Sequence, residues 1–179
     1  MEMLKKFFST HYENAIRLKE RFKCTEPKIW SSLIVSNELA VQYGHLINTT
    51  YQDEFFNENN RNIVNVGDEV ADVLLQLCYL GYLEEVDFTK IDGYEIKDID
   101  VKYGVILLGQ LIEALMEKEG YRYRKERVGF ETIQHFIEDR IIRLLLVVYK
   151  FSCLNNLDIV NDFDLMLKDA NGFLDRYVQ

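Results

Sequence analysis

The sequence predicts an all-α protein, a single domain built as a bundle of about six helices. The chain of 179 residues holds only one proline and nine glycines, so few positions interrupt a helix. Apolar side chains recur at helical spacing, at i+3 and i+4, through long segments. Few runs show the strict alternation that is typical of a strand.

Composition and charge narrow the class of protein. With 48% hydrophobic and 13% aromatic residues, the chain can form a core and does not resemble a disordered protein. A formal net charge of −9 argues against broad binding to nucleic acid or to anionic membranes. A phosphate ligand remains compatible with this charge, because a divalent cation can bridge acidic residues and phosphate.

Targeting features are absent from the sequence. The start lacks the apolar segment of a signal peptide, and no apolar run has the length of a membrane span. Cys24, Cys78 and Cys153 are widely spaced and form no CxxC pair, which favours reduced thiols over a disulfide framework. We therefore expect a cytoplasmic protein.

The first predicted helix carries an apolar stripe that runs from Leu4 to Phe22. The stretch "CTEPKIW" then ends it and starts a second helix. Thr25 can act as a cap, and Pro27 lies where a first helical turn tolerates proline. The second helix is expected to run from there to about Asn48.

An Asn-rich connection precedes the third helix, for which Asn65 is the predicted cap and "GDEVADVLLQLCYLGYL" (67–83) the body. A looser stretch, "DFTKIDGYEIKDID", separates it from a helix over "VKYGVILLGQLIEALMEKEG". After the basic connection "YRYRKERVG", two further helices are predicted, from about Phe130 to Leu154 and from about Asp158 to Tyr177.

The third helix resembles a later one. At an offset of 71 residues, "DEVADVLLQLCYLGYLEEVDF" lies over "DRIIRLLLVVYKFSCLNNLDI" without a gap, and the preceding helices match more weakly. The pattern predicts an internal repeat within the single domain 1–179, with units at about 25–90 and 100–160. Chance similarity between two leucine-rich helices is the alternative. Two acids differ between the units, since Arg140 stands at the position of Glu69 and Arg143 at that of Asp72.

Three acids open the third helix, which is otherwise apolar on nearly every side. Asp68 favours the positive end of the helix dipole and needs no other role. Glu69 and Asp72 are i, i+3 neighbours, so their side chains lean to the same side. Glu69 and Asp72 are therefore candidates for two of the ligands of a metal site.

The second helix offers the other half. Its acid is Glu38, which Gln42 and His45 follow on the same face at i+4 and i+7. Antiparallel packing of the two helices would bring Glu38 to face the acidic pair. Oxygen ligands without cysteine favour Mg²⁺ or Mn²⁺. A ferritin-like di-iron site would need Glu-x-x-His, and a zinc site a His/Cys cluster, and the sequence has neither.

These motifs resemble the MazG-like, all-α NTP pyrophosphohydrolase superfamily, which includes the dimeric dUTPases. Glu69 and Asp72 match the E-x-x-D motif of its later catalytic helix, and "NELAVQYGHLI" resembles the earlier helix with its E-E-x-x-E motif. The similarity covers roughly residues 25–83. It departs from the family in that Glu38 is the only acid of the first motif. According to register, the other positions hold either Ile34 and Val35 or Asn37 and Val41.

The resemblance implies hydrolysis of a nucleoside triphosphate to the monophosphate and pyrophosphate. Glu38, Glu69 and Asp72 would then be the catalytic and metal-holding residues for Mg²⁺ or Mn²⁺, with Asn37 or Gln42 as neutral helpers. The basic residues Arg122, Arg124, Lys125 and Arg127 would meet the outer phosphates, or else form a solvated loop that balances an acidic protein.

Several alternatives stay open. Trp30 would stack on a base or pack in the core, and Arg140 and Arg143 would pair with acids of the first unit or reach phosphate. The resemblance is compatible with a homodimer and with a duplicated chain that imitates one. The alternative function is a catalytically inactive MazG-like helical module for binding or structure.

Overall fold

The computed structural model describes every residue except 26–29, 56–65, 96–99, 124–125, 127–128 and 178–179. The described residues form helices and no strand, which confirms the predicted all-α bundle. The α-helices are α1 (Glu2–Thr25), α2 (Ser32–Phe55), α3 (Val66–Leu83), α4 (Tyr103–Lys118), α5 (Ile133–Leu154) and α6 (Ile159–Tyr177), and a short 3₁₀ helix, η1, spans Phe88–Gly93.

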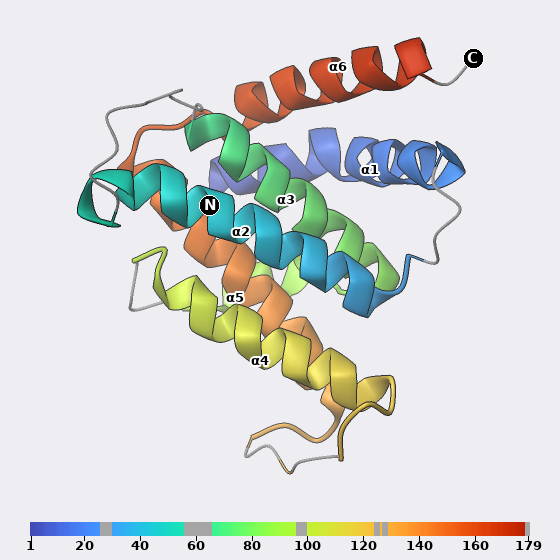
Figure 1. The fold of residues 1–179 in the computed structure, drawn as a ribbon. Helices are drawn as coiled ribbons and strands as arrows, with labels where there is room; N and C mark the ends of the chain where they lie inside the picture. Colours follow the sequence, from blue (N-terminus) through green and yellow to red (C-terminus); the bar gives the residue numbers. More distant parts are fainter. Residues whose placement is uncertain (26–29, 56–65, 96–99, 124–125, 127–128, 178–179) are drawn as a thin grey trace.

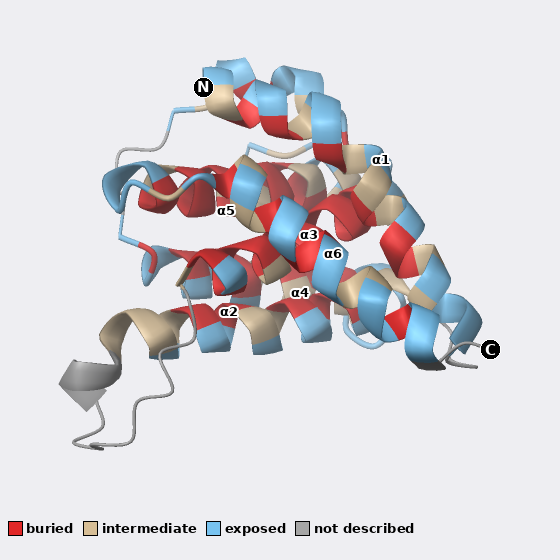
Figure 2. Ribbon diagram, turned by 90° about the horizontal axis from the view of Figure 1, so that it is seen from above, coloured by how far each residue is buried: buried red, intermediate tan, exposed pale blue. Residues whose placement is uncertain are grey.

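Three helix pairs stack on one another, α1 with α6, α2 with α3, and α4 with α5 (Figure 1). Helix α3 occupies the centre, where it contacts α1, α2, α5 and α6. Thirteen of its 18 residues are buried, which explains why its sequence is apolar on nearly every side. Figure 2 shows the same pattern, with the buried residues of α3 and α5 inside and the exposed faces of α1, α2 and α6 outside. None of the described helices is long and apolar enough to cross a bilayer.

Three helix boundaries differ from the prediction. Helix α2 continues past Asn48 to Phe55, with a non-helical backbone at Tyr51, because Ile47 and Tyr51 still pack on the core. Helix α5 begins at Ile133 rather than Phe130, since the Thr132 side chain caps it by accepting a hydrogen bond from the His135 amide. Helix α2 also begins at Ser32, later than the predicted start near Pro27, since Trp30 and Ser31 are not helical. Pro27 itself and the predicted cap Asn65 lie outside the described residues.

Helices α3 and α5 end in the same way. In each, the chain turns through a residue with φ of 55°, Glu85 in one and Asn156 in the other. The amides of Val86 and Leu157 each donate a 2.9 Å hydrogen bond back to the helix, as in a Schellman motif. These positions are separated by the offset of the sequence comparison. The like ends of the two helices are compatible with the predicted duplication, which stays a prediction.

Candidate functional site

Glu69 of α3 faces helix α2. The residue is 8% exposed, and Oε2 lies 3.9 Å from Nδ1 of His45. Helix α2 runs antiparallel to α3 (Figure 1), so this contact sets the register between them. A helix advances about 1.5 Å per residue. One turn back along α2 and one turn forward along α3 therefore bring Gln42 level with Asp72.

The same register separates Glu38 from the acidic pair. Another turn along each helix places Glu38 level with Gln76, about 10 Å along the axis from His45. Glu38 and the neighbouring Asn37 are both exposed. By this register, Gln42 and His45 lie level with the turns of α3 that carry Asp72 and Glu69, and Glu38 lies farther along the same face of α2, level with Gln76.

The acidic pair is poorly stabilised in its charged form. Burial, followed by repulsion from Asp68 and Glu69, raises the pKa of Asp72 to about 6. Burial also raises the pKa of Glu69, and the nearby His45 imidazole partly opposes that change. Within the described part of the chain, the Asp72 carboxylate receives no hydrogen bond and forms no ion pair. Asp68 is exposed in the first turn, as expected of a helix-start acid.

Gln42 adds another oxygen that lacks a donor. Its Oε1 atom is buried and has no hydrogen-bond partner among the described residues. Buried oxygens without donors are costly, and a cation or an ordered water would satisfy them. Over the part of the chain that is described, no group of three or more His, Cys, Asp or Glu side chains is placed to hold a metal. A cation at Glu69, Asp72 and Gln42 would therefore take its remaining ligands from water or phosphate.

A buried lysine lies beside this cluster. Lys19 of α1 is 4% exposed, and its Nζ donates a 3.0 Å hydrogen bond to Oε1 of Gln76. The same ammonium lies 3.9 Å from the centroid of the Trp30 ring, whose edge meets Tyr79. One face of Trp30 is thus occupied by Lys19, and the ring packs partly buried against the core. The lysine also lowers the pKa of Asp72, opposing the larger effects of burial and the neighbouring acids.

Sequence reasoning missed Lys19. The available indication was its position, four residues after Ala15 on the apolar stripe of the first helix, where a charged side chain is unexpected. Its partner Gln76 is 57 residues away in the chain, and the sequence pattern contains nothing that pairs them.

The second unit has a different charge arrangement at the equivalent turn. The buried carboxylate of Asp139 accepts a hydrogen bond from Nη1 of Arg140 at 2.6 Å and one from Nε of Arg143 at 2.9 Å. These arginines therefore pair on their own helix. Of the basic connection, Arg122 pairs with Glu113 at 2.8 Å, whereas Arg124, Lys125 and Arg127 lie outside the described residues.

Comparisons of the chain with protein-family models, curated proteins and solved structures found no match.

Proposed function

We propose that the chain is a Mg²⁺- or Mn²⁺-dependent nucleotide pyrophosphohydrolase of the MazG-like type, which converts an NTP or dNTP to the monophosphate and pyrophosphate. The observations that carry this proposal are the raised pKa values of Glu69 and the half-buried Asp72 on α3, and the buried, unsatisfied Oε1 atom of Gln42 on the facing helix α2. The E-x-x-D resemblance of α3 supports it as well. The chemistry of this donor set fits a hard divalent cation.

In this proposal Glu69 and Asp72 hold the cation, and Gln42 offers it a neutral oxygen. The metal, when bound, would neutralise charge on the triphosphate oxygens. His45 lies beside Glu69 and would fix the orientation of that carboxylate. Asp72 must be ionised to take part, so binding would strengthen as the pH rises past its pKa of about 6. Glu38, level with Gln76, would act on water or phosphate outside the pair.

A specific observation favours a second candidate, an inactive helical module for binding or structure. The Lys19 ammonium already supplies positive charge near Asp72 and Gln76. Ile34 and Val35 stand where one register of the family motif has acids. A lysine in this place would stabilise the fold without a metal, as buried charges require a counter-charge or hydrogen bonds.

The two candidates separate in one experiment on the purified full chain. Pyrophosphate release is followed for each NTP and dNTP with Mg²⁺ or Mn²⁺, and melting temperature is measured with metal and nucleotide together. The enzyme proposal expects turnover with at least one nucleotide, lost in Glu69→Gln and in Asp72→Asn. Asp68→Asn, an exposed acid in the same turn, is the matched control and should retain activity. Absence of turnover together with an unchanged melting temperature would favour the inactive module.

A further inference from the structure

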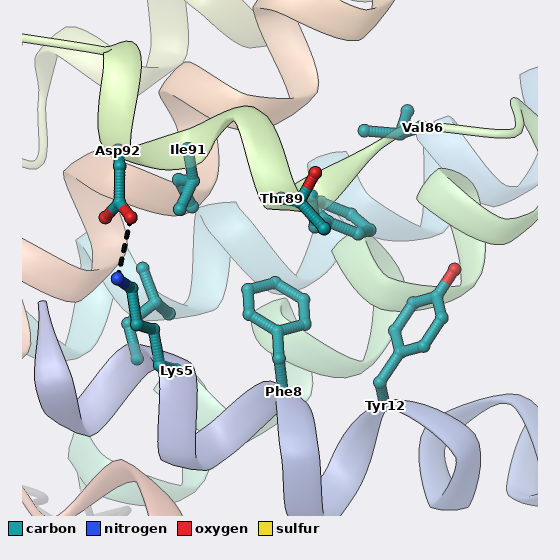
Figure 3. Close-up of a pocket in the computed structure, with 9 residues that line it drawn as sticks. Lys5, Phe8, Tyr12, Val86, Thr89, Ile91 and Asp92 are labelled. Carbon is teal, nitrogen blue, oxygen red and sulfur yellow. Dashed lines mark ion pairs between the residues drawn. The ribbon is translucent and has the colours of Figure 1, made fainter.

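A cavity of about 500 Å³ lies between α1 and the segment that follows α3. It is separate from the acidic cluster on α2 and α3, and its volume is within the range of small-molecule sites. In Figure 3, Lys5 and Asp92 meet at one end, Tyr12 stands at the other, and Phe8 lies between them. The lining side chains come from α1 on one side and from η1 and its approach on the other.

The wall of the cavity is aromatic. Phe8 of α1 stacks on Phe88 of η1 with ring centroids 4.6 Å apart, and Tyr12 meets Phe88 edge-on at 5.6 Å. Leu4, Val86 and Ile91 complete the apolar lining. Such surfaces favour a planar ring, which can stack on one aromatic side chain and meet another at its edge. The Tyr12 hydroxyl makes no hydrogen bond to any described residue and can serve a polar atom on that ring.

The polar end of the cavity carries one charge of each sign. Nζ of Lys5 lies 2.6 Å from Oδ2 of Asp92, and the side chains are 59% and 53% exposed. An ion pair this exposed contributes little to stability and rearranges readily. A ligand with only a carboxylate would be repelled by Asp92, and a ligand with only an ammonium would be repelled by Lys5. A zwitterion satisfies both side chains together.

A second cavity beside α1 differs from the first in its lining residues. It lies on another side of α1, near Lys6, Cys153 and Asp158, with a volume of about 890 Å³. It also carries charges of both signs, but no aromatic side chain is among its described lining residues. The combination of an aromatic wall with a paired cation and anion thus distinguishes the cavity at Phe8 from this larger cavity.

We propose that the cavity at Phe8 and Phe88 binds a free aromatic α-amino acid. The ring packs along the aromatic wall beside Phe8 and Tyr12, the carboxylate pairs with Lys5, and the ammonium pairs with Asp92. This site is independent of the acidic cluster, so the outcome of its test does not depend on nucleotide hydrolysis.

Four ligands test the proposal on the full chain by calorimetry and ligand-observed NMR. L-Tryptophan is the probe, indole-3-propionate lacks the ammonium, tryptamine lacks the carboxylate, and glycine lacks the ring. We expect L-tryptophan to bind at least about threefold more tightly than each single-charge analogue, since each lost ion pair is an exposed one. Glycine should not bind detectably.

Two variants assign the charges. Lys5→Met should abolish the advantage of L-tryptophan over tryptamine, and Asp92→Asn its advantage over indole-3-propionate. Lys6→Met, the next residue of α1 and outside this cavity, is the matched control and should bind like the wild type. Both replaced side chains at the cavity are exposed, and circular dichroism verifies folding.

Three results would overturn the proposal. The first is the absence of binding by L-tryptophan at millimolar concentration. The second is equal affinity for L-tryptophan and a single-charge analogue. The third is tryptophan binding that neither Lys5→Met nor Asp92→Asn changes.

Discussion

Replacing Asp72 with asparagine tests the electrostatics of the acidic cluster directly. The carboxylate has its pKa raised from an ordinary value of 3.8 to about 6, mainly by burial. Between these values the folded chain binds more protons than the unfolded chain, so the free energy of unfolding falls as the pH rises. The loss is complete above the folded pKa and persists at neutral pH. Asparagine has nearly the same shape and no charge to lose.

The magnitude follows from the shift. Two pKa units correspond to roughly 3 kcal/mol. Asp72 is partly exposed, and solvent screening reduces this to about 1–2 kcal/mol. We therefore expect Asp72→Asn to raise the free energy of unfolding by about 1–2 kcal/mol near pH 7 and by much less near pH 4. The same variant should also lose any stabilisation by Mg²⁺ or Mn²⁺. Asp72→Asn is therefore expected to be more stable than the wild type without metal and to gain nothing when metal is added.

Urea denaturation at both pH values, followed by circular dichroism, measures the difference. Asp68→Asn is the comparison, because Asp68 is exposed in the same helical turn, and its effect should be smaller than that of Asp72→Asn since it removes only the repulsion between Asp68 and its neighbours. A destabilised Asp72→Asn variant at neutral pH would refute the reasoning. It would mean that the carboxylate has a favourable partner in its charged form.

Three further predictions concern the same folded chain. Stabilisation of the wild type by Mn²⁺ should grow from about pH 5 to pH 7 as Asp72 ionises, and a melting-temperature shift independent of pH would contradict this. Asp139→Asn should lower the free energy of unfolding in urea by about 2–3 kcal/mol, because it leaves two arginines without their buried carboxylate, whereas an equal loss in the exposed Glu131→Gln would dispute that cause. Burial lowers the pKa of His11 below its ordinary 6.5, so wild-type stability should fall as the pH drops through that value. His11→Leu should flatten this part of the pH profile, and an unchanged slope would exclude His11 as its source.

The helical pattern was sufficient for the architecture. The helical spacing of apolar residues and the composition predict the all-α class and the central helix α3. A helix that is buried on every side needs apolar residues on nearly every side, and this pattern can be read in the sequence. Helix ends were less predictable. The polar residues around Asn48 suggested a stop, whereas apolar packing by Ile47 and Tyr51 carries α2 farther.

The candidate site depends on the axial register between α2 and α3, which the sequence of either helix alone does not determine. Glu38, Gln42 and His45 share a face of α2, so the sequence could place any of them opposite Glu69. The axial register of the two helices decides, and it selects His45. Lys19 was missed for the same reason, since its place beside α3 follows from how α1 packs across the bundle.

The two similar helices balance their charges in opposite ways, and this contrast supports the proposed cation site at α3. On α5, two arginines at the positions of Glu69 and Asp72 neutralise the buried Asp139. On α3 the acids keep those positions, and their raised pKa values show that the imidazole of His45 and the ammonium of Lys19 offset burial only in part. Positive charge is thus built into α5 and incomplete beside α3. The proposed divalent cation would therefore act at α3, where it would stabilise two carboxylates whose negative charge the neighbouring side chains balance only in part.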